Sequence, residues 1–167
     1  MNPRILVHGL SGITLAAILP FGLAACGNGD DEATATPTPP GPTANDIAIE
    51  LTTGQALYTE SEAVEFRAVA TNTADEIREL EFATGQRFEL DVEHDGELTW
   101  RWSDGRVFTQ AIEEVELGPG ESIEFIAEWD QEDRDGEPAS AGQYTAVATL
   151  LAGDEPAATV EFEIAEG

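Results

Sequence analysis

The sequence predicts an all-β fold for most of the chain. From Asp46 onward, apolar and polar residues alternate in short runs, which is the period of half-buried antiparallel strands. Glycine-containing turn signals separate these runs, and no apolar stripe with helical spacing follows residue 25. Eight or nine short strands over about 120 residues are typical of an immunoglobulin-like antiparallel β-sandwich. A signal helix and a disordered linker are expected to precede it.

Strands are expected, in order, wherever every second residue is apolar. The turn signals between them lie at 54–55, 85–86, 95–96, 104–105, 118–120 and 153–154. Grouped by strand, the expected inward-facing residues are Ile47, Ile49 and Leu51; Val64, Phe66, Ala68 and Ala70; Leu80 and Phe82; Phe88, Leu90 and Val92; Leu98, Trp100 and Trp102; Ile123, Phe125, Ala127 and Trp129; Tyr144, Ala146, Ala148 and Leu150; and Val160, Phe162 and Ile164.

The register of one hairpin follows from its apolar residues. A two-residue turn at Asp95 and Gly96 would place apolar residues opposite polar ones. A three-residue loop at 94–96 instead places Val92 opposite Leu98 and keeps the apolar side chains on one face. The sequence therefore predicts a three-residue loop in which Gly96 takes the left-handed position of a G1 bulge.

Residues 1–25 are predicted to be a bacterial lipoprotein signal peptide. An apolar run follows a short head that carries Arg4, and the tetrapeptide 23–26 resembles a lipobox. Small residues before Cys26 let the chain enter a signal-peptidase groove, and the Cys26 thiol then becomes the site of lipid attachment. These features predict a lipid-anchored protein on the extracytoplasmic side of the cell membrane or cell envelope.

A transmembrane anchor is the alternative for this segment, because the apolar run is about long enough to span a bilayer. Pro20 and Gly22 interrupt the run and no basic stop-transfer cluster follows it, which favours the lipid anchor. Residues 26–45 are rich in proline, threonine and aspartate, a composition that cannot bury apolar area, so a disordered tether is expected there. Residues 46–167 remain as the predicted domain.

The chain is strongly acidic, because 34 Asp and Glu residues against 7 Lys and Arg residues give a formal net charge of −27. Such a surface repels phosphates, so no nucleic-acid partner is expected. It also repels anionic lipid headgroups, so membrane contact is expected only through the lipid on Cys26. Two origins of the composition stay open: a salt-rich habitat favours carboxylates, and a GC-rich genome explains the absence of lysine.

No catalytic site is evident in the sequence, and neither enzymatic activity nor a cofactor is expected. His94 is the only histidine after residue 25, and its neighbour Asp95 belongs to a turn rather than to a triad. No glycine-rich loop precedes a helix, so nucleotide binding has no support. The only cysteine is Cys26, so no internal disulfide can form.

The acidic segment from Asp130 to Ala141 is the candidate for recognition, because function on a sandwich tends to lie in loops. Its alternate carboxylates could surround a calcium ion. However, Arg134 interrupts the spacing and no acid follows Gly136 at the distance of an EF-hand loop, so no metal site is expected. The alternative is an irregular hairpin connection with no binding role. The candidate protein-contact residues are Asp130, Glu132, Asp133, Arg134, Asp135 and Glu137.

The three tryptophans have two interpretations. Trp100, Trp102 and Trp129 could form an aromatic platform for a sugar. However, Trp100 and Trp102 alternate with Arg101 and share the predicted inward face, which favours a place in the core.

Short motifs follow one another in a fixed order between Ile47 and Leu151. A Thr-Gly-Gln turn is followed by an aromatic residue and an acid, and a tryptophan-rich strand comes next. The ordered set comprises Asn72, Phe82–Leu90, Trp100–Ser103, Phe108, Pro119–Glu121, Trp129 and Gly142–Thr145. Together these motifs resemble the intracellular proteinase inhibitor family, BsuPI.

The resemblance implies an immunoglobulin-like inhibitor of a subtilisin-type serine proteinase, and so a protein partner. It supplies no reactive-site residues for this chain. The namesake of the family acts inside the cell, whereas this chain carries a predicted export signal, so a target outside the cytoplasm is expected. The alternative is a non-inhibitory adhesion or assembly module of the envelope, because a fold can keep its shape and change its partner.

Overall fold

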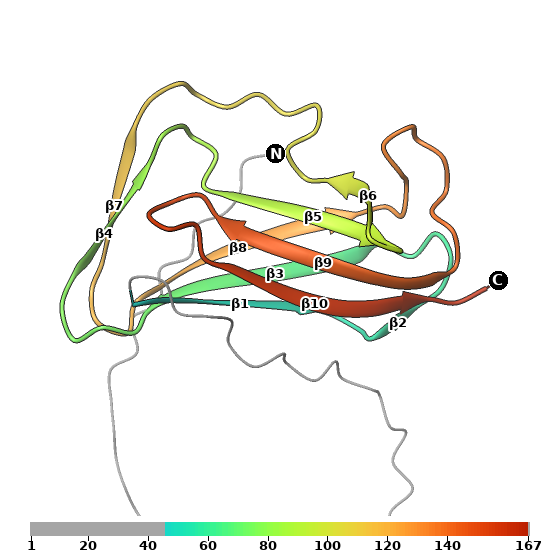
Figure 1. Ribbon diagram of the computed structural model, residues 1–167, viewed down its shortest axis with the longest axis horizontal. Coiled ribbons are helices and arrows are strands. Elements are labelled where there is room, and N and C mark those ends of the chain that lie inside the picture. The colour runs from blue at the N-terminus through green and yellow to red at the C-terminus, as the bar shows by residue number, and fades with distance from the viewer. Residues whose placement is uncertain (1–45, 167) are drawn as a thin grey trace, which may run out of the picture.

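Alternating apolar residues form ten strands in the part of the chain that the structure, a computed structural model, describes: residues 46–166 (Figure 1). The predicted signal peptide, the tether and Cys26 lie outside the described residues. The strands are β1 (Ile47–Thr53), β2 (Leu57–Tyr58), β3 (Val64–Asn72), β4 (Arg78–Phe82), β5 (Phe88–His94), β6 (Glu97–Arg101), β7 (Glu113–Leu117), β8 (Ser122–Trp129), β9 (Gly142–Leu150) and β10 (Ala157–Ile164).

The strands pair in three sheets. One sheet has the order β1-β3-β8, a second has the order β2-β10-β9-β5-β6, and β4 pairs with β7. Figure 1 shows the two larger sheets as two stacked layers, with the β4–β7 ribbon beyond one end. Named strands pair antiparallel in residues 46–166, except that β2 and β10 are parallel. The predicted immunoglobulin-like β-sandwich is therefore confirmed.

The core consists of the inward members of these alternating runs. Along β3, for example, Val64 and Phe66 are buried, while Glu65 and Arg67 between and beyond them are exposed. The ring of Phe162 is the centre of an aromatic cluster, since it contacts four other aromatic rings at centroid distances of 5.6 to 6.2 Å. Its ring partners are Tyr58, Phe66, Trp129 and Tyr144.

The core interpretation of the tryptophans is confirmed. The exposed fractions of Trp129 and Trp102 are 1% and 9%, and Trp100 packs against the same cluster.

Strands β2 and β7 are the elements that the alternation did not predict. β2 has two residues, and β7 has the sequence EEVEL, in which three glutamates outweigh the apolar signal.

The predicted three-residue loop of the β5–β6 hairpin is wrong. Asp95 and Gly96 have φ values of 51° and 79°, and His94 pairs directly with Glu97. Positive φ at both central residues defines a two-residue turn of type I′, for which Asp-Gly is a preferred sequence because its twist matches the flanking strands.

With the two-residue turn alone, the apolar side chains of β5 and β6 would lie on opposite faces of the hairpin. A β-bulge beyond the turn brings them onto the same face. Glu93 pairs with Leu98, but Val92 pairs with Trp100, so Thr99 is the extra residue on β6. The apolar side chains beyond the bulge then share the core face. The apolar pattern thus required one additional residue in the hairpin, and the chain places it in the strand rather than in the turn.

Asn72 marks the corner at which β3 leaves the sandwich for the β4–β7 ribbon. Its backbone N–H donates to the Glu121 carbonyl at 2.9 Å, and its own carbonyl accepts from Gly120 at 2.9 Å. Its buried side-chain amide donates to the carbonyls of Leu117 and Glu76, at 2.8 Å each.

Residues 46–166 contain no helix long and apolar enough to cross a membrane.

Candidate functional site

The predicted contact loop, residues 130–141, connects β8 to β9 at one end of the sandwich. It forms a small ordered hairpin, since Glu132 and Pro138 make a β-bridge. The side chain of Asp133 is half-buried. The remaining candidate side chains, Asp130, Glu132, Arg134, Asp135 and Glu137, are exposed and available to a partner.

The carboxylate of Asp133 stabilises the tip of this hairpin instead of facing a ligand. Its Oδ1 accepts hydrogen bonds from the backbone N–H groups of Asp135 and Glu137, at 2.9 Å each. The Gly136 N–H also donates to the Asp133 carbonyl at 3.0 Å. Within residues 46–166, no group of three or more His, Cys, Asp or Glu residues is arranged to hold a metal ion.

Gln131 fixes the base of the loop to the neighbouring turn between β2 and β3. Its side chain, which is 3% exposed, accepts a hydrogen bond from the Ser61 N–H at 2.9 Å. It donates to the carbonyls of Thr59 and Glu62 at 2.9 and 2.7 Å. This amide satisfies three backbone groups of the turn between β2 and β3, so the loop base and that turn are held together.

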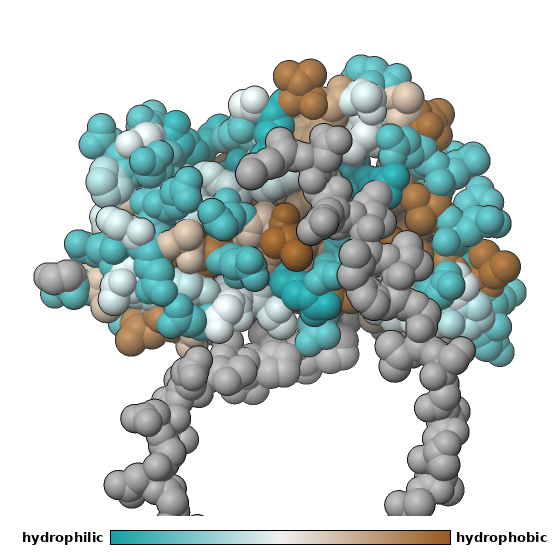
Figure 2. Space-filling model, turned by 180° about the vertical axis from the view of Figure 1, so that it is seen from behind, coloured by the Kyte–Doolittle hydropathy of each residue, from teal (hydrophilic) through white to brown (hydrophobic). Residues whose placement is uncertain are grey.

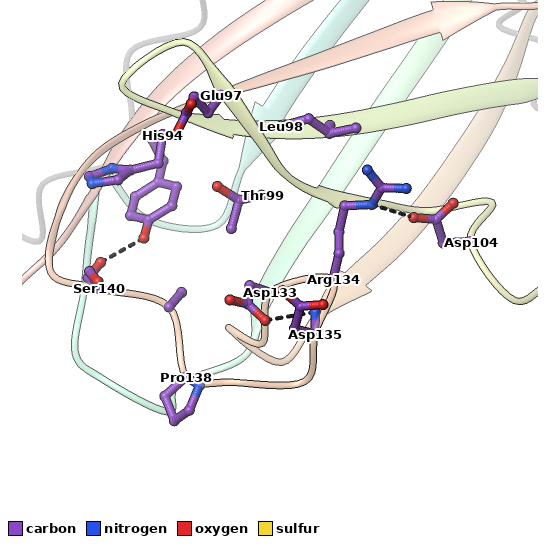
Figure 3. A pocket seen from close by; sticks show the side chains of 12 residues that line it. His94, Glu97, Leu98, Thr99, Asp104, Asp133, Arg134, Asp135, Pro138 and Ser140 are labelled. Carbon is purple, nitrogen blue, oxygen red and sulfur yellow. Dashed lines mark hydrogen bonds and ion pairs between the residues drawn. The ribbon is translucent and has the colours of Figure 1, made fainter.

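An open groove of about 580 Å³ lies between this loop and the β5–β6 hairpin (Figure 3). Arg134 reaches across to Asp104, with Nε and Oδ2 at 2.9 Å, and so links the loop to the segment after β6. On the other side, the Tyr144 hydroxyl donates to the Ser140 carbonyl at 2.6 Å. Burial, with a smaller contribution from the charge of Asp95, raises the pKa of Tyr144 above its ordinary value.

His94 lines the groove, but its surroundings are those of a packing residue. Its ring stacks on Tyr144 with a centroid distance of 4.6 Å, and Nδ1 lies 2.9 Å from the Gln143 carbonyl. Gly142 makes room for the ring, because a Cβ at that position would lie 2.6 Å from His94 Cε1. No hydrogen bond within the described chain joins His94 to a serine, so these residues do not form a nucleophile–base pair.

Sequence reasoning missed a second candidate segment, residues 103–112, between β6 and β7. In Figure 1 this connection arches away from the sheets along the upper margin of the molecule. Val107 is 97% exposed, although its two neighbours both pack on Trp102. One sequence signal could have indicated this segment: residues 105–112 carry no acid in a chain of net charge −27.

Solved structures of similar architecture share little sequence with this chain. The CARDB domain of the PF1109 protein from Pyrococcus furiosus, crystallised with di-metal ions, is 17% identical, over 73% of this chain and 94% of that one, with a TM-score of 0.42. Spo0M, a sporulation control protein from Bacillus subtilis, is 11% identical, over 72% of this chain and 50% of that one, with a TM-score of 0.45. The β-glucosidase EmGH1 from Erythrobacter marinus is 14% identical, over 71% of this chain and 15% of that one, with a TM-score of 0.44. The chain thus spans half or less of the last two proteins.

A more specific similarity lies in the sequence. No curated protein matches the chain. The model of the BsuPI family, described as intracellular proteinase inhibitor, matches residues 51–155. This match covers more than half of the chain, runs from β1 to the turn before β10, and includes both candidate segments. The chain therefore belongs to the BsuPI family of intracellular proteinase inhibitors.

Proposed function

We propose that this chain is a lipid-anchored inhibitor of a subtilisin-type serine proteinase, acting on the extracytoplasmic side of the cell membrane or envelope. The observation that carries the inhibitory role is the family match over residues 51–155. The location is supported by the lipobox-like residues 23–26 and by the proline-rich segment 26–45, a suitable tether between a membrane and a domain.

Inhibition would require the domain to cover the active-site cleft of the proteinase. The loop at 130–141 offers exposed side chains for this contact, and Gln131 and Asp133 hold its backbone in one conformation. A segment that is already ordered loses little conformational entropy when it binds, so more of its contact energy becomes affinity. The proposed mechanism is steric occlusion and needs no chemistry from the inhibitor.

The test of inhibition uses the full chain, purified in detergent from membranes. It is titrated into several subtilisin-type enzymes, and the residual hydrolysis of a small chromogenic substrate is measured. We expect a concentration-dependent loss of activity in at least one of them. No inhibition at micromolar inhibitor across the panel would overturn the proposed function.

The anchor is tested separately, by mass spectrometry of the purified chain. A mature N-terminus at Cys26 that carries acyl chains is expected, and the Cys26→Ser variant should lack them. A chain that begins with the unmodified initiator methionine would contradict the lipid anchor and leave the inhibitory role intact.

A non-inhibitory adhesion or assembly module is the second candidate, and one observation favours it. Strand β6 (Glu97–Arg101) is the outer strand of the five-stranded sheet, so its free edge can accept a strand from another protein. Capture of envelope proteins from native membranes by a chain that inhibits no proteinase would support this candidate instead.

A further inference from the structure

Val107 combines full exposure with firmly held neighbours. It is 97% exposed, more than any other large hydrophobic side chain in the described part of the chain. The hydrophobic residues visible in Figure 2 lie in small separate groups on a largely hydrophilic face. An aliphatic side chain exposed to this extent adds no hydrophobic stabilisation to the fold, so the whole of Val107 is accessible to a partner.

The residues on either side of Val107 are fixed on Trp102. The Arg106 guanidinium lies over the Trp102 ring at 4.5 Å from its centroid, and Arg106 Nε donates to the Trp102 carbonyl at 2.6 Å. The Phe108 ring lies 5.7 Å from the Trp102 ring. Residues 106 and 108 therefore face the domain, and Val107 between them faces solvent.

Two further contacts hold the ends of the segment. The carboxylate of Glu89 accepts from both the Ser103 N–H and the Ser103 hydroxyl, at 3.1 and 2.5 Å. The Gly85 N–H donates to the Thr109 carbonyl at 3.0 Å. The segment is thus attached on both sides of Val107, and it can present this residue without a large loss of entropy on binding.

The backbone of Val107 is available as well as its side chain. No hydrogen bond within residues 46–166 uses its N–H or its carbonyl. The N–H groups at the tip of the 130–141 loop, in contrast, already bind the Asp133 side chain. An extended segment with free main-chain groups can add β-type hydrogen bonds to a partner, as peptides do in binding clefts.

The chemistry of the segment points to one kind of pocket. Residues 105–112 contain no acid, and the one cation, Arg106, is occupied by Trp102. A serine proteinase reads its substrate through a primary specificity pocket, which is apolar in some enzymes and carries a buried carboxylate in trypsin-type enzymes. An exposed valine fits an apolar pocket. In the pocket of a trypsin-type enzyme it would leave the buried carboxylate without a partner, which is unfavourable.

We infer that segment 103–112 is the part of this domain that enters the cleft of the target proteinase, with Val107 in the primary specificity pocket. The inference rests on the proposed inhibitory function and names the residue that sets its specificity. The 130–141 loop, joined to this segment by the Arg134–Asp104 ion pair, would then flank the cleft. Enzymes with a small or medium apolar pocket are the expected targets.

The experiment measures inhibition constants of the full chain against subtilisin, an elastase and a trypsin-type enzyme. The wild-type chain should inhibit one or both of the first two, and not the third. Val107→Asp should weaken that inhibition by about a hundredfold, as expected for a residue at the centre of an interface. Val107→Arg should lose it as well and should gain inhibition of the trypsin-type enzyme.

Ile77→Asp is the matched control, because Ile77 is a 61% exposed aliphatic residue outside both candidate segments. It should change inhibition by no more than about twofold. Melting curves show whether each variant is folded, and exposure of Val107 predicts unchanged melting for both Val107 variants.

The outcomes separate the two claims. If the wild-type chain inhibits one of these enzymes and Val107→Asp inhibits it equally well, the assignment of Val107 is overturned and the inhibitory function stands. If Glu137→Arg loses inhibition and Val107→Asp does not, the contact lies in the 130–141 loop. If the wild-type chain inhibits none of the three enzymes or further subtilisin-type enzymes, the proposed function and this inference both fail.

Discussion

Asn72 shows how one buried amide can hold two parts of a β domain together. Its side chain donates to the carbonyls of Glu76 and Leu117 and accepts from the Ala74 N–H at 2.9 Å. All of these partners lie beyond the end of β3, where the backbone leaves the regular sheet. A resemblance in sequence indicated Asn72 only as the residue that ends a strand, because one of its partners, Leu117, lies 45 residues further along the chain.

Replacing Asn72 with Asp tests this role without a change of shape. The carboxylate cannot donate to the two carbonyls, so unfolding free energy should fall by about 2 to 4 kcal/mol at neutral pH. Part of the loss should be recovered in acid, where a protonated carboxyl donates again. Chemical denaturation at several pH values measures this, and a variant as stable as the wild type would contradict it.

The turn at Gly96 provides a second test at the scale of one residue. Gly96 has φ = 79° and open space around its Cβ position, so Gly96→Ala should cost about 1 kcal/mol through backbone strain alone. Gly54 is the control, because its backbone is not in the left-handed region and an added Cβ would meet only an ordinary contact at 3.7 Å. Equal stability of the two alanine variants in urea would rule out the strain.

Among the elements, the turn between β2 and β3 depends on the ionised carboxylate of Glu62. This carboxylate accepts from the Thr59 N–H at 3.0 Å and from Gln55 Nε2 at 2.6 Å. The backbone hydrogen bond from Thr59 is the main reason why the pKa of Glu62 is lowered from its ordinary value. A lowered folded-state pKa adds stability above the ordinary pKa, and that stability is lost as the pH falls through the folded-state pKa.

Glu62→Gln should therefore be less stable than the wild type near pH 7, and the difference should shrink as the pH falls below the ordinary pKa of a glutamate and on through the lowered folded-state pKa. Urea midpoints across this range measure the difference. Glu60→Gln, which removes the same charge from an exposed neighbour, serves as the control variant. A gap between wild type and Glu62→Gln that stays constant with pH would contradict the role of the ionised carboxylate.

The loop at 130–141 should depend on Gln131 for its order. Gln131→Ala removes the partner of three backbone groups, and unfolding free energy should fall by about 2 kcal/mol. Hydrogen exchange should accelerate at residues 59–62 and 130–141 more than in the sheets. Gln143→Ala serves as the control, because Gln143 is exposed and bonds through its side chain to Glu163. Unchanged exchange in the loop would show that Gln131 does not hold it.

Alternation in the sequence predicted the strands well where apolar residues alternate regularly with polar or charged ones, as in β3 and β10, and less well elsewhere. It could not reveal β7, because Val115 and Leu117 stand among three glutamates. It also misplaced the extra residue of the β5–β6 hairpin. One extra residue, whether in the turn or in a bulge of the strand, leaves the same alternate side chains facing inward in the rest of the hairpin, so the alternation cannot distinguish the two. The contacts of Trp102 with Arg106 and Phe108 depend on how the chain bends after β6, which no periodicity describes.

For the molecule as a whole, the main unfavourable electrostatic contribution is repulsion among the many carboxylates. Five of the six arginines in residues 46–166 form ion pairs with carboxylates, and most carboxylates there have no cation beside them. Salt screens the repulsion among them, so the melting temperature should rise between about 0.05 and 1 M NaCl. Sucrose at equal osmolality controls for solute exclusion. A flat or falling melting temperature would contradict this expectation and the salt-rich habitat.

The position of β10 has a consequence for how the core closes. This strand lies between β2 and β9 in the larger sheet, yet it comes last in the chain order of the described strands. Until it docks, β2 has no paired strand within residues 46–166, and the Phe162 ring is missing from the aromatic cluster. The aromatic core of the sandwich is therefore complete only when the last of the described strands has taken its place between the other two.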